Sequence, residues 1–221
     1  LGYEGASVRQ QVELLMSDYF RHARAVSRGL TRTCRAIRAV EPTAPKPDGD
    51  NVVLTAEGIA FADPAHAATE PASWLRAFVA AIALDAPVAD DALVLIERAQ
   101  GTAAYSPEAF VPTERHRSDL LEFLRPRPGL SARLFEMRDC GLLGALFPEF
   151  ETIVCHVTRD FYHKYTVDEH TLLTIRAVEQ LLVDERFGPV LRGLEAPELL
   201  VLALLFHDVG KSRDGDHSEE G

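Results

Sequence analysis

The chain has 221 residues, 47% of them hydrophobic, which allows one well-buried core or two small ones. Its formal net charge is −11 and no stripe of Lys and Arg stands out, so nucleic acid is not an expected partner. The longest apolar runs, such as 199–206, are too short to cross a bilayer, which takes about 20 residues, and no membrane partner is expected either. Three scattered cysteines, Cys34, Cys140 and Cys155, fit a reducing cytoplasm better than a disulfide framework.

The first part of the chain predicts one long helix followed by a hairpin. Residues 8–36 carry apolar side chains at three- and four-residue steps, which is typical of an amphipathic helix. Prolines and a glycine within 41–50 end this pattern. Two short runs, 51–55 and 58–62, have the composition of strands and predict a minor hairpin. The chain begins with Leu rather than Met and ends with Gly in a polar stretch, which suggests a piece of a longer protein.

The middle of the chain predicts short and medium helices separated by Pro and Gly. A helix begins at Pro71, and further helices are expected over 90–98, 118–124 and 130–139, with a short piece that Pro148 closes. The expected fold class is therefore mainly α, a helical bundle with a small β-hairpin.

The last third predicts two helices in succession. Thr166 is suited to be the N-cap of the first, with Glu169 three residues later to complete a capping box. Pro197 opens the second. Its segment 199–206 is apolar on all sides, so we expect it to be central and fully surrounded.

The chemically informative feature is the His207-Asp208 pair at the end of that apolar helix. Polar groups at the tip of a buried helix cost free energy unless a partner satisfies them, and a divalent metal ion is a partner for both imidazole and carboxylate. If the two helices are antiparallel, His170 at the start of the first lies beside the end of the second and can be the third ligand. Lys211 follows one turn after Asp208, where its ammonium can meet a phosphate oxygen or, alternatively, stabilise the helix dipole.

These residues also match a known pattern. His170 with His207-Asp208 resembles the H…HD signature of the HD-domain metal-dependent phosphohydrolases, and His207-Asp-Val-Gly-Lys211 is close to the central motif of that family. The string 161–172, FYHKYTVDEHTL, is similar to the corresponding stretch of the bifunctional PII uridylyltransferase/uridylyl-removing enzymes. So are Met137-Arg-Asp-Cys-Gly-Leu-Leu-Gly, Phe147-Pro-Glu-Phe150 and Gly215-Asp-His-Ser218.

The resemblance implies an all-helical HD domain that hydrolyses the UMP-tyrosine phosphodiester on a PII regulatory protein. His170, His207 and Asp208 would be metal ligands, and Asp208 and Lys211 would act in catalysis. His163 and His217 would lie in a second shell or at a second metal, although the His163 ring has an alternative place beneath the neighbouring tyrosines. The cofactor would be a divalent ion, Mg, Mn, Fe or Zn. The partners would be PII and a small-molecule effector such as glutamine, the latter acting through regions absent here.

Two regions are expected on this basis. Residues 1–150 would be a helical linker or companion region with the hairpin near 51–62, and residues 151–221 would be the N-terminal part of the HD domain. The family's final aspartate ligand and its nucleotidyltransferase half are not in the sequence, so hydrolysis by this stretch alone is not expected. Two alternatives stay open: an HD phosphohydrolase acting on a free or cyclic nucleotide, and a catalytically inert helical regulatory module.

Overall fold

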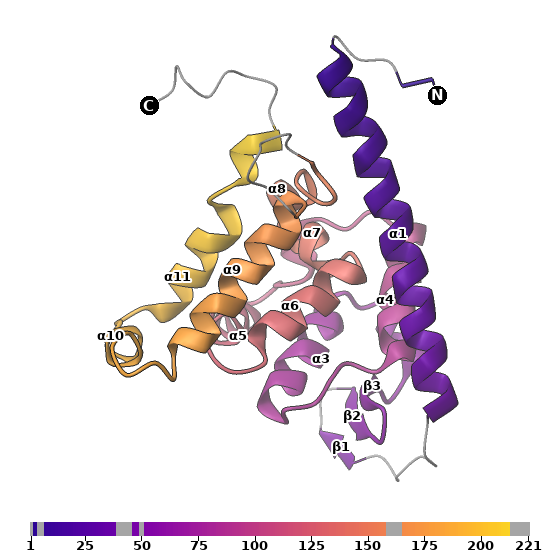
Figure 1. The fold of residues 1–221 in the computed structure, drawn as a ribbon. Helices are drawn as coiled ribbons and strands as arrows, with labels where there is room; N and C mark the ends of the chain where they lie inside the picture. Colours follow the sequence, from indigo (N-terminus) through magenta and orange to yellow (C-terminus); the bar gives the residue numbers. More distant parts are fainter. Residues whose placement is uncertain (1, 4–6, 39–45, 49–50, 158–164, 213–221) are drawn as a thin grey trace.

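The computed structural model describes residues 2–3, 7–38, 46–48, 51–157 and 165–212. Within them the chain is mainly helical, and a small antiparallel sheet lies at one end of the helical body (Figure 1), which confirms the expected fold class. None of the described helices is both long and apolar enough to span a membrane. The elements in chain order are α1 Val8–Arg38, β1 Lys46–Asp48, β2 Val52–Thr55, β3 Gly58–Phe61, α2 Pro64–Ala67, α3 Ala72–Ala83, α4 Asp90–Thr102, α5 Glu114–Phe123, α6 Leu130–Asp139, α7 Leu142–Leu146, α8 Pro148–Glu151, α9 Val167–Leu181, α10 Gly188–Arg192 and α11 Pro197–Phe206, with 3-10 turns at Pro107–Ala109 and Val209–Ser212.

The hairpin prediction is confirmed, and the sheet has one strand more than predicted. β2 and β3 pair antiparallel with Val53 opposite Ala60, and β1 adds to the free edge of β2. The sheet is tied to the helices where the Ile59 amide donates to the Pro87 carbonyl. A Cβ on Gly58 would lie 2.2 Å from that same carbonyl oxygen, so only glycine fits at the point of contact.

The main hydrophobic cluster runs from the sheet through α3 and α6 to α9 and α11, and a small second cluster joins Val53, Ala60 and Ala89. Trp74 on α3 is fully buried, donates from its indole nitrogen to the Ala67 carbonyl at 2.7 Å, and meets Tyr105 edge to face. The main cluster includes Leu172 and Ile175 of α9 and extends beyond the boundary predicted at residue 150. The division into two regions at that residue stays a prediction.

The last two long helices form the pair that the site requires. α9 and α11 run antiparallel and in contact, joined through α10 (Figure 1). The prediction that α11 is fully surrounded is wrong: Val201 and Leu205 are buried, whereas Leu199 is 57% exposed and Ala203 is also exposed. Within the described residues, α11 is an outer helix that packs through one side only.

Candidate metal centre

The end of α11 is fixed by apolar packing against the body. Leu205 is fully buried, and the Phe206 ring meets Phe147 edge to face with 5.6 Å between centroids. The next residue, His207, caps the helix and directs its Nδ1 at the Leu204 carbonyl oxygen, 2.6 Å away. Because a carbonyl only accepts, Nδ1 carries the hydrogen, and Nε2 keeps the lone pair that a metal ion needs.

The start of α9 brings a second imidazole to the same place. Thr166 is the N-cap residue, as predicted, but its side chain makes no capping bond, and the His170 amide donates to its carbonyl oxygen instead. The predicted capping box is therefore wrong, because Glu169 is drawn away to Arg138, 2.6 Å from its carboxylate. The His170 and His207 rings lie 5.8 Å apart between centroids.

Asp208 completes the group. Its Oδ2 lies 3.3 Å from His207 Nε2, 3.8 Å from His170 Nε2 and 2.8 Å from Lys211 Nζ. One potential ligand atom from each of His170, His207 and Asp208 lies within 4.8 Å of the others. The Asp208 side chain is only 9% exposed, whereas the His170 and His207 side chains are 41% and 34% exposed. The group is therefore anchored on its inner side and open on its outer side.

The donor set fits a divalent ion. Two imidazole nitrogens and one carboxylate oxygen suit zinc, iron or manganese, and the remaining coordination positions are left for water or substrate. The Lys211 ammonium bonded to Asp208 neutralises this mostly buried carboxylate. His163 and His217 lie outside the described residues, and their roles stay predictions.

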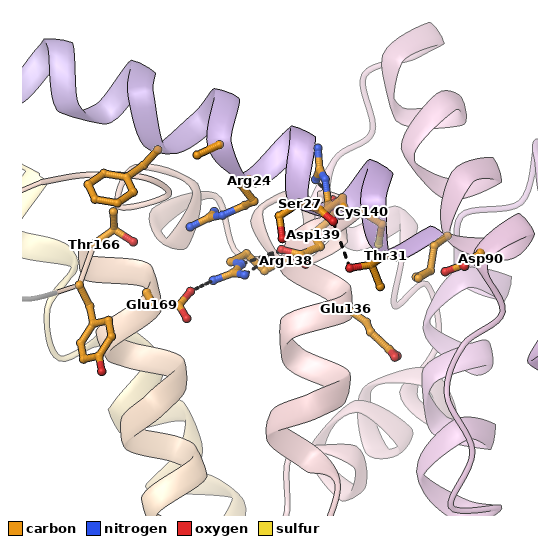
Figure 2. A pocket seen from close by; sticks show the side chains of 15 residues that line it. Arg24, Ser27, Thr31, Asp90, Glu136, Arg138, Asp139, Cys140, Thr166 and Glu169 are labelled. Carbon is orange, nitrogen blue, oxygen red and sulfur yellow. Dashed lines mark hydrogen bonds and ion pairs between the residues drawn. The ribbon is translucent and has the colours of Figure 1, made fainter. Parts of the chain in front are cut away.

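A cavity of about 510 Å³ lies on another side of the first turn of α9, between that turn, α1 and the end of α6. Figure 2 shows Arg24 of α1 beside Arg138 and Glu169, which are bonded to each other. The sequence alone assigned no functional role to Arg24 or Arg138. The sequence does hold a hint of this contact. Arg138 lies in the quoted segment 137–140, and the acids Asp168 and Glu169 directly precede His170.

Comparison with known proteins shows what the chain is similar to. Residues 167–221 match the HD domain. The whole chain aligns with a bifunctional uridylyltransferase/uridylyl-removing enzyme of Thiobacillus denitrificans, with 33% identity over 232 residues. This chain is a relative of the bifunctional uridylyltransferase/uridylyl-removing enzymes and carries an HD domain.

Other relatives bear the same name and match a shorter part of the chain. The protein of Pseudomonas savastanoi pv. phaseolicola is 41% identical over 113 residues, and that of Nitrosospira multiformis is 39% identical over 110 residues, covering 48% and 47% of this chain. The chain spans 27% of the length of the Thiobacillus relative and 13% and 12% of the other two. These findings support the prediction of an enzyme with hydrolase character.

Proposed function

We propose that this chain supplies the first part of a metal-dependent phosphodiesterase site that removes UMP from a tyrosine of a PII regulatory protein. The observation that carries the proposal is the convergence of His170, His207 and Asp208 from two antiparallel helices, with ligand atoms within 4.8 Å of one another. The relatives, whose name includes a uridylyl-removing activity, supply the substrate class.

Each residue of the site has a role that follows from its chemistry. His170 and His207 would hold a divalent ion through their Nε2 atoms, and Asp208 would hold it through the carboxylate that now faces both rings. Once bound, such an ion neutralises charge on the phosphate and lowers the pKa of water, which serves phosphodiester hydrolysis at neutral pH. Lys211 would exchange its bond to Asp208 for one to a phosphate oxygen, placing a second positive charge where negative charge develops.

The test measures UMP release from uridylylated PII by the natural full-length protein. His207→Ala and Asp208→Asn should each lower the rate by more than the roughly 10–100-fold typical of residues that only support a ligand. His66→Ala is the matched control, because this histidine is exposed on α2 and pairs only with Glu70 among the contacts described. Its rate should equal that of the unmodified protein.

Two other outcomes would replace the proposal. Hydrolysis of a free or cyclic nucleotide from a panel, with uridylylated PII left intact, would indicate an HD phosphohydrolase of different specificity. If the full-length protein keeps its UMP release and its Mn²⁺ binding in both site variants, the residues His207 and Asp208 have no part in either. The chain would then be a catalytically inert helical module.

A further inference from the structure

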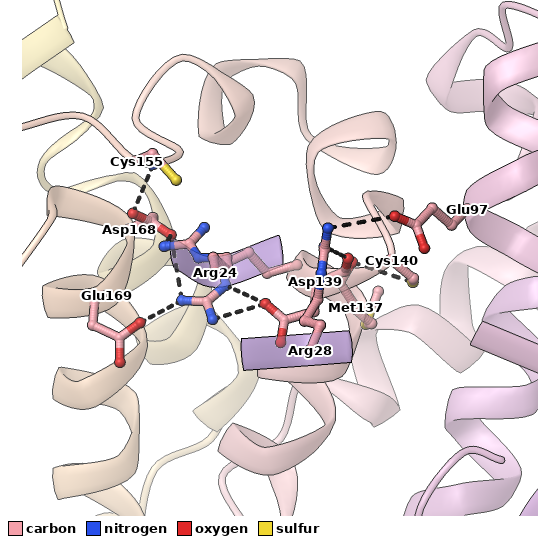
Figure 3. Close-up of polar contacts among 10 residues, drawn as sticks. Arg24, Arg28, Glu97, Met137, Asp139, Cys140, Cys155, Asp168 and Glu169 are labelled. Atoms are coloured by element: carbon pink, nitrogen blue, oxygen red, sulfur yellow. Dashed lines mark hydrogen bonds and ion pairs between the residues drawn. The ribbon is translucent and has the colours of Figure 1, made fainter. Parts of the chain in front are cut away.

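A fully buried carboxylate lies two residues before His170. Asp168 has no exposed side-chain area, and its Oδ2 lies 2.8 Å from an Arg24 nitrogen and 3.3 Å from an Arg138 nitrogen. Its Oδ1 accepts a hydrogen bond from the Cys155 amide at 3.0 Å. Figure 3 shows Arg24 and Cys155 on either side of this carboxylate. Burial of a carboxylate is costly without partners, and here both oxygens have them.

Arg138, at the end of α6, binds the two acids of this turn together. Its side chain is 6% exposed, and the nitrogen that contacts Asp168 also lies 2.6 Å from Glu169, while a second nitrogen lies 2.8 Å from Asp139. Burial alone would lower the pKa of Arg138, but the three carboxylates together raise it, so its charge is kept. Successive residues of a helix point about 100° apart, and one guanidinium holding Asp168 and Glu169 therefore opposes rotation of the turn about its axis.

Small rotations of this turn matter for a metal site. Side-chain atoms lie roughly 5–6 Å from a helix axis, so a rotation of about 10° moves them by roughly 1 Å. Ligand distances in metal sites vary by only about 0.2 Å. An imidazole at position 170 is thus correctly placed only if the turn that carries it is held to within a few degrees.

The second arginine comes from a different part of the molecule. Arg24 belongs to α1, and none of the α1 side chains that the structure describes (residues 8–31, 33 and 34) is buried. Arg24 is 16% exposed and reaches from this helix to the buried Asp168. The position of α1 is therefore connected directly to the turn that carries His170.

We propose that Asp168, held between Arg138 and Arg24, is a positioning residue for His170, and that Arg24 couples the placement of α1 to the metal centre. This proposal rests on the proposed function, because it requires that His170 bind a metal ion. The competing interpretation is an ion-pair network that stabilises the fold and has no effect on the metal centre.

The experiment measures Mn²⁺ affinity of the natural full-length protein, together with its thermal midpoint and the absorption spectrum of the Co²⁺-loaded form. Asp168→Asn keeps the acceptor for the Cys155 amide but removes the charge, and it should weaken Mn²⁺ binding about 10–100-fold. Arg24→Gln should weaken binding about 3–10-fold and alter the Co²⁺ spectrum, whereas Arg24→Lys should restore most of the affinity.

Arg21→Gln is the matched control. Arg21 lies one turn before Arg24 on α1, is exposed to solvent, and pairs with Asp18 of the same helix. This variant should leave Mn²⁺ affinity and the Co²⁺ spectrum unchanged. If Asp168→Asn does not fold, Arg24→Gln decides, because it changes a helix without buried side chains in its described part.

The results separate the two proposals. In one result, Asp168→Asn and Arg24→Gln lower the thermal midpoint but leave the Mn²⁺ affinity and the Co²⁺ spectrum like those of the unmodified protein. If His207→Ala still abolishes Mn²⁺ binding, that result overturns the positioning role and leaves the metal centre in place. Mn²⁺ binding that survives His207→Ala would overturn the metal centre itself, and the positioning role with it.

Discussion

α1 and α3 are both amphipathic helices, but they are attached to the molecule in different ways. α3 buries more than half of its residues, Trp74 and Phe78 among them, in the core. α1 is more than twice as long, and no side chain in its described part is buried. Arg24 and Arg28 attach it to the body through ion pairs with Asp168 and Glu97. Apolar periodicity therefore predicts that a helix forms, whereas its mode of attachment depends on side chains outside the pattern.

The largest expected effect tests the apolar side of this comparison. Trp74→Ala removes a fully buried ring and its hydrogen bond to Ala67, and it should lower the free energy of unfolding by about 3–5 kcal/mol. Tyr19→Ala on α1 is the matched control, because Tyr19 is 60% exposed and its loss should cost within about 0.5 kcal/mol. Urea unfolding measures both. Equal costs would mean that the two helices are attached alike.

The next effect tests the ionic side. Arg138→Met leaves Asp168, Glu169 and Asp139 without their common partner. It should cost about 3 kcal/mol, because the buried Asp168 carboxylate then keeps Arg24 and the Cys155 amide but loses one of its two cations. Arg125→Met, at an exposed pair with Glu122, should cost at most about 1 kcal/mol. Urea unfolding of the two variants checks the difference, and a cost below that of Arg125→Met would show that the network contributes nothing to stability.

The sequence predicted most helices and strands correctly, but it did not predict which segments pack against some of them. Turn residues and apolar periodicity place α3, α6, α9 and the hairpin, because these signals are local. The approach of His170 to the His207-Asp208 pair also follows from helix ends, once the two helices are taken as antiparallel. Their role as metal ligands stays a prediction.

What the sequence did not predict depends on contacts between distant segments. Arg138 and Asp168 are separated by 30 residues, and no periodic pattern in the sequence predicts that their side chains are in contact. The purely apolar α11 was expected to be surrounded, yet Leu199 is 57% exposed. Composition shows that such a helix favours burial, but it does not say which segment covers it.

A smaller effect uses two thiols, one in the body and one on α1. Burial raises the pKa of Cys140 from its ordinary value of 9.0 to about 12. Between these pH values the unfolded thiol loses its proton while the folded one keeps it, so folding loses about 1.4 kcal/mol per pH unit from this group as pH rises. Unfolding of the unmodified chain should therefore show a steeper loss of stability above pH 9 than unfolding of Cys140→Ala.

Cys34→Ala is the control for this slope, because the Cys34 thiol is exposed on α1 in the folded chain, much as it is in the unfolded chain. Its stability should fall with pH as steeply as that of the unmodified chain. A Cys140→Ala variant with an unchanged slope would mean that the Cys140 thiol ionises in the folded state as easily as in the unfolded one.

The smallest effect concerns how salt acts on the two helices. The Arg28–Glu97 pair is partly exposed at 3.4 Å, so salt screens it, whereas the packing of α3 is apolar. Raising NaCl from about 0.05 to 0.5 M should lower the opening free energy of α1 amides by up to about 1 kcal/mol in hydrogen exchange and leave that of α3 amides unchanged. Glu97→Gln removes the screened pair and should reduce this salt dependence. Salt-independent exchange in α1 would show that its apolar residues, and not its arginines, hold the helix to the body.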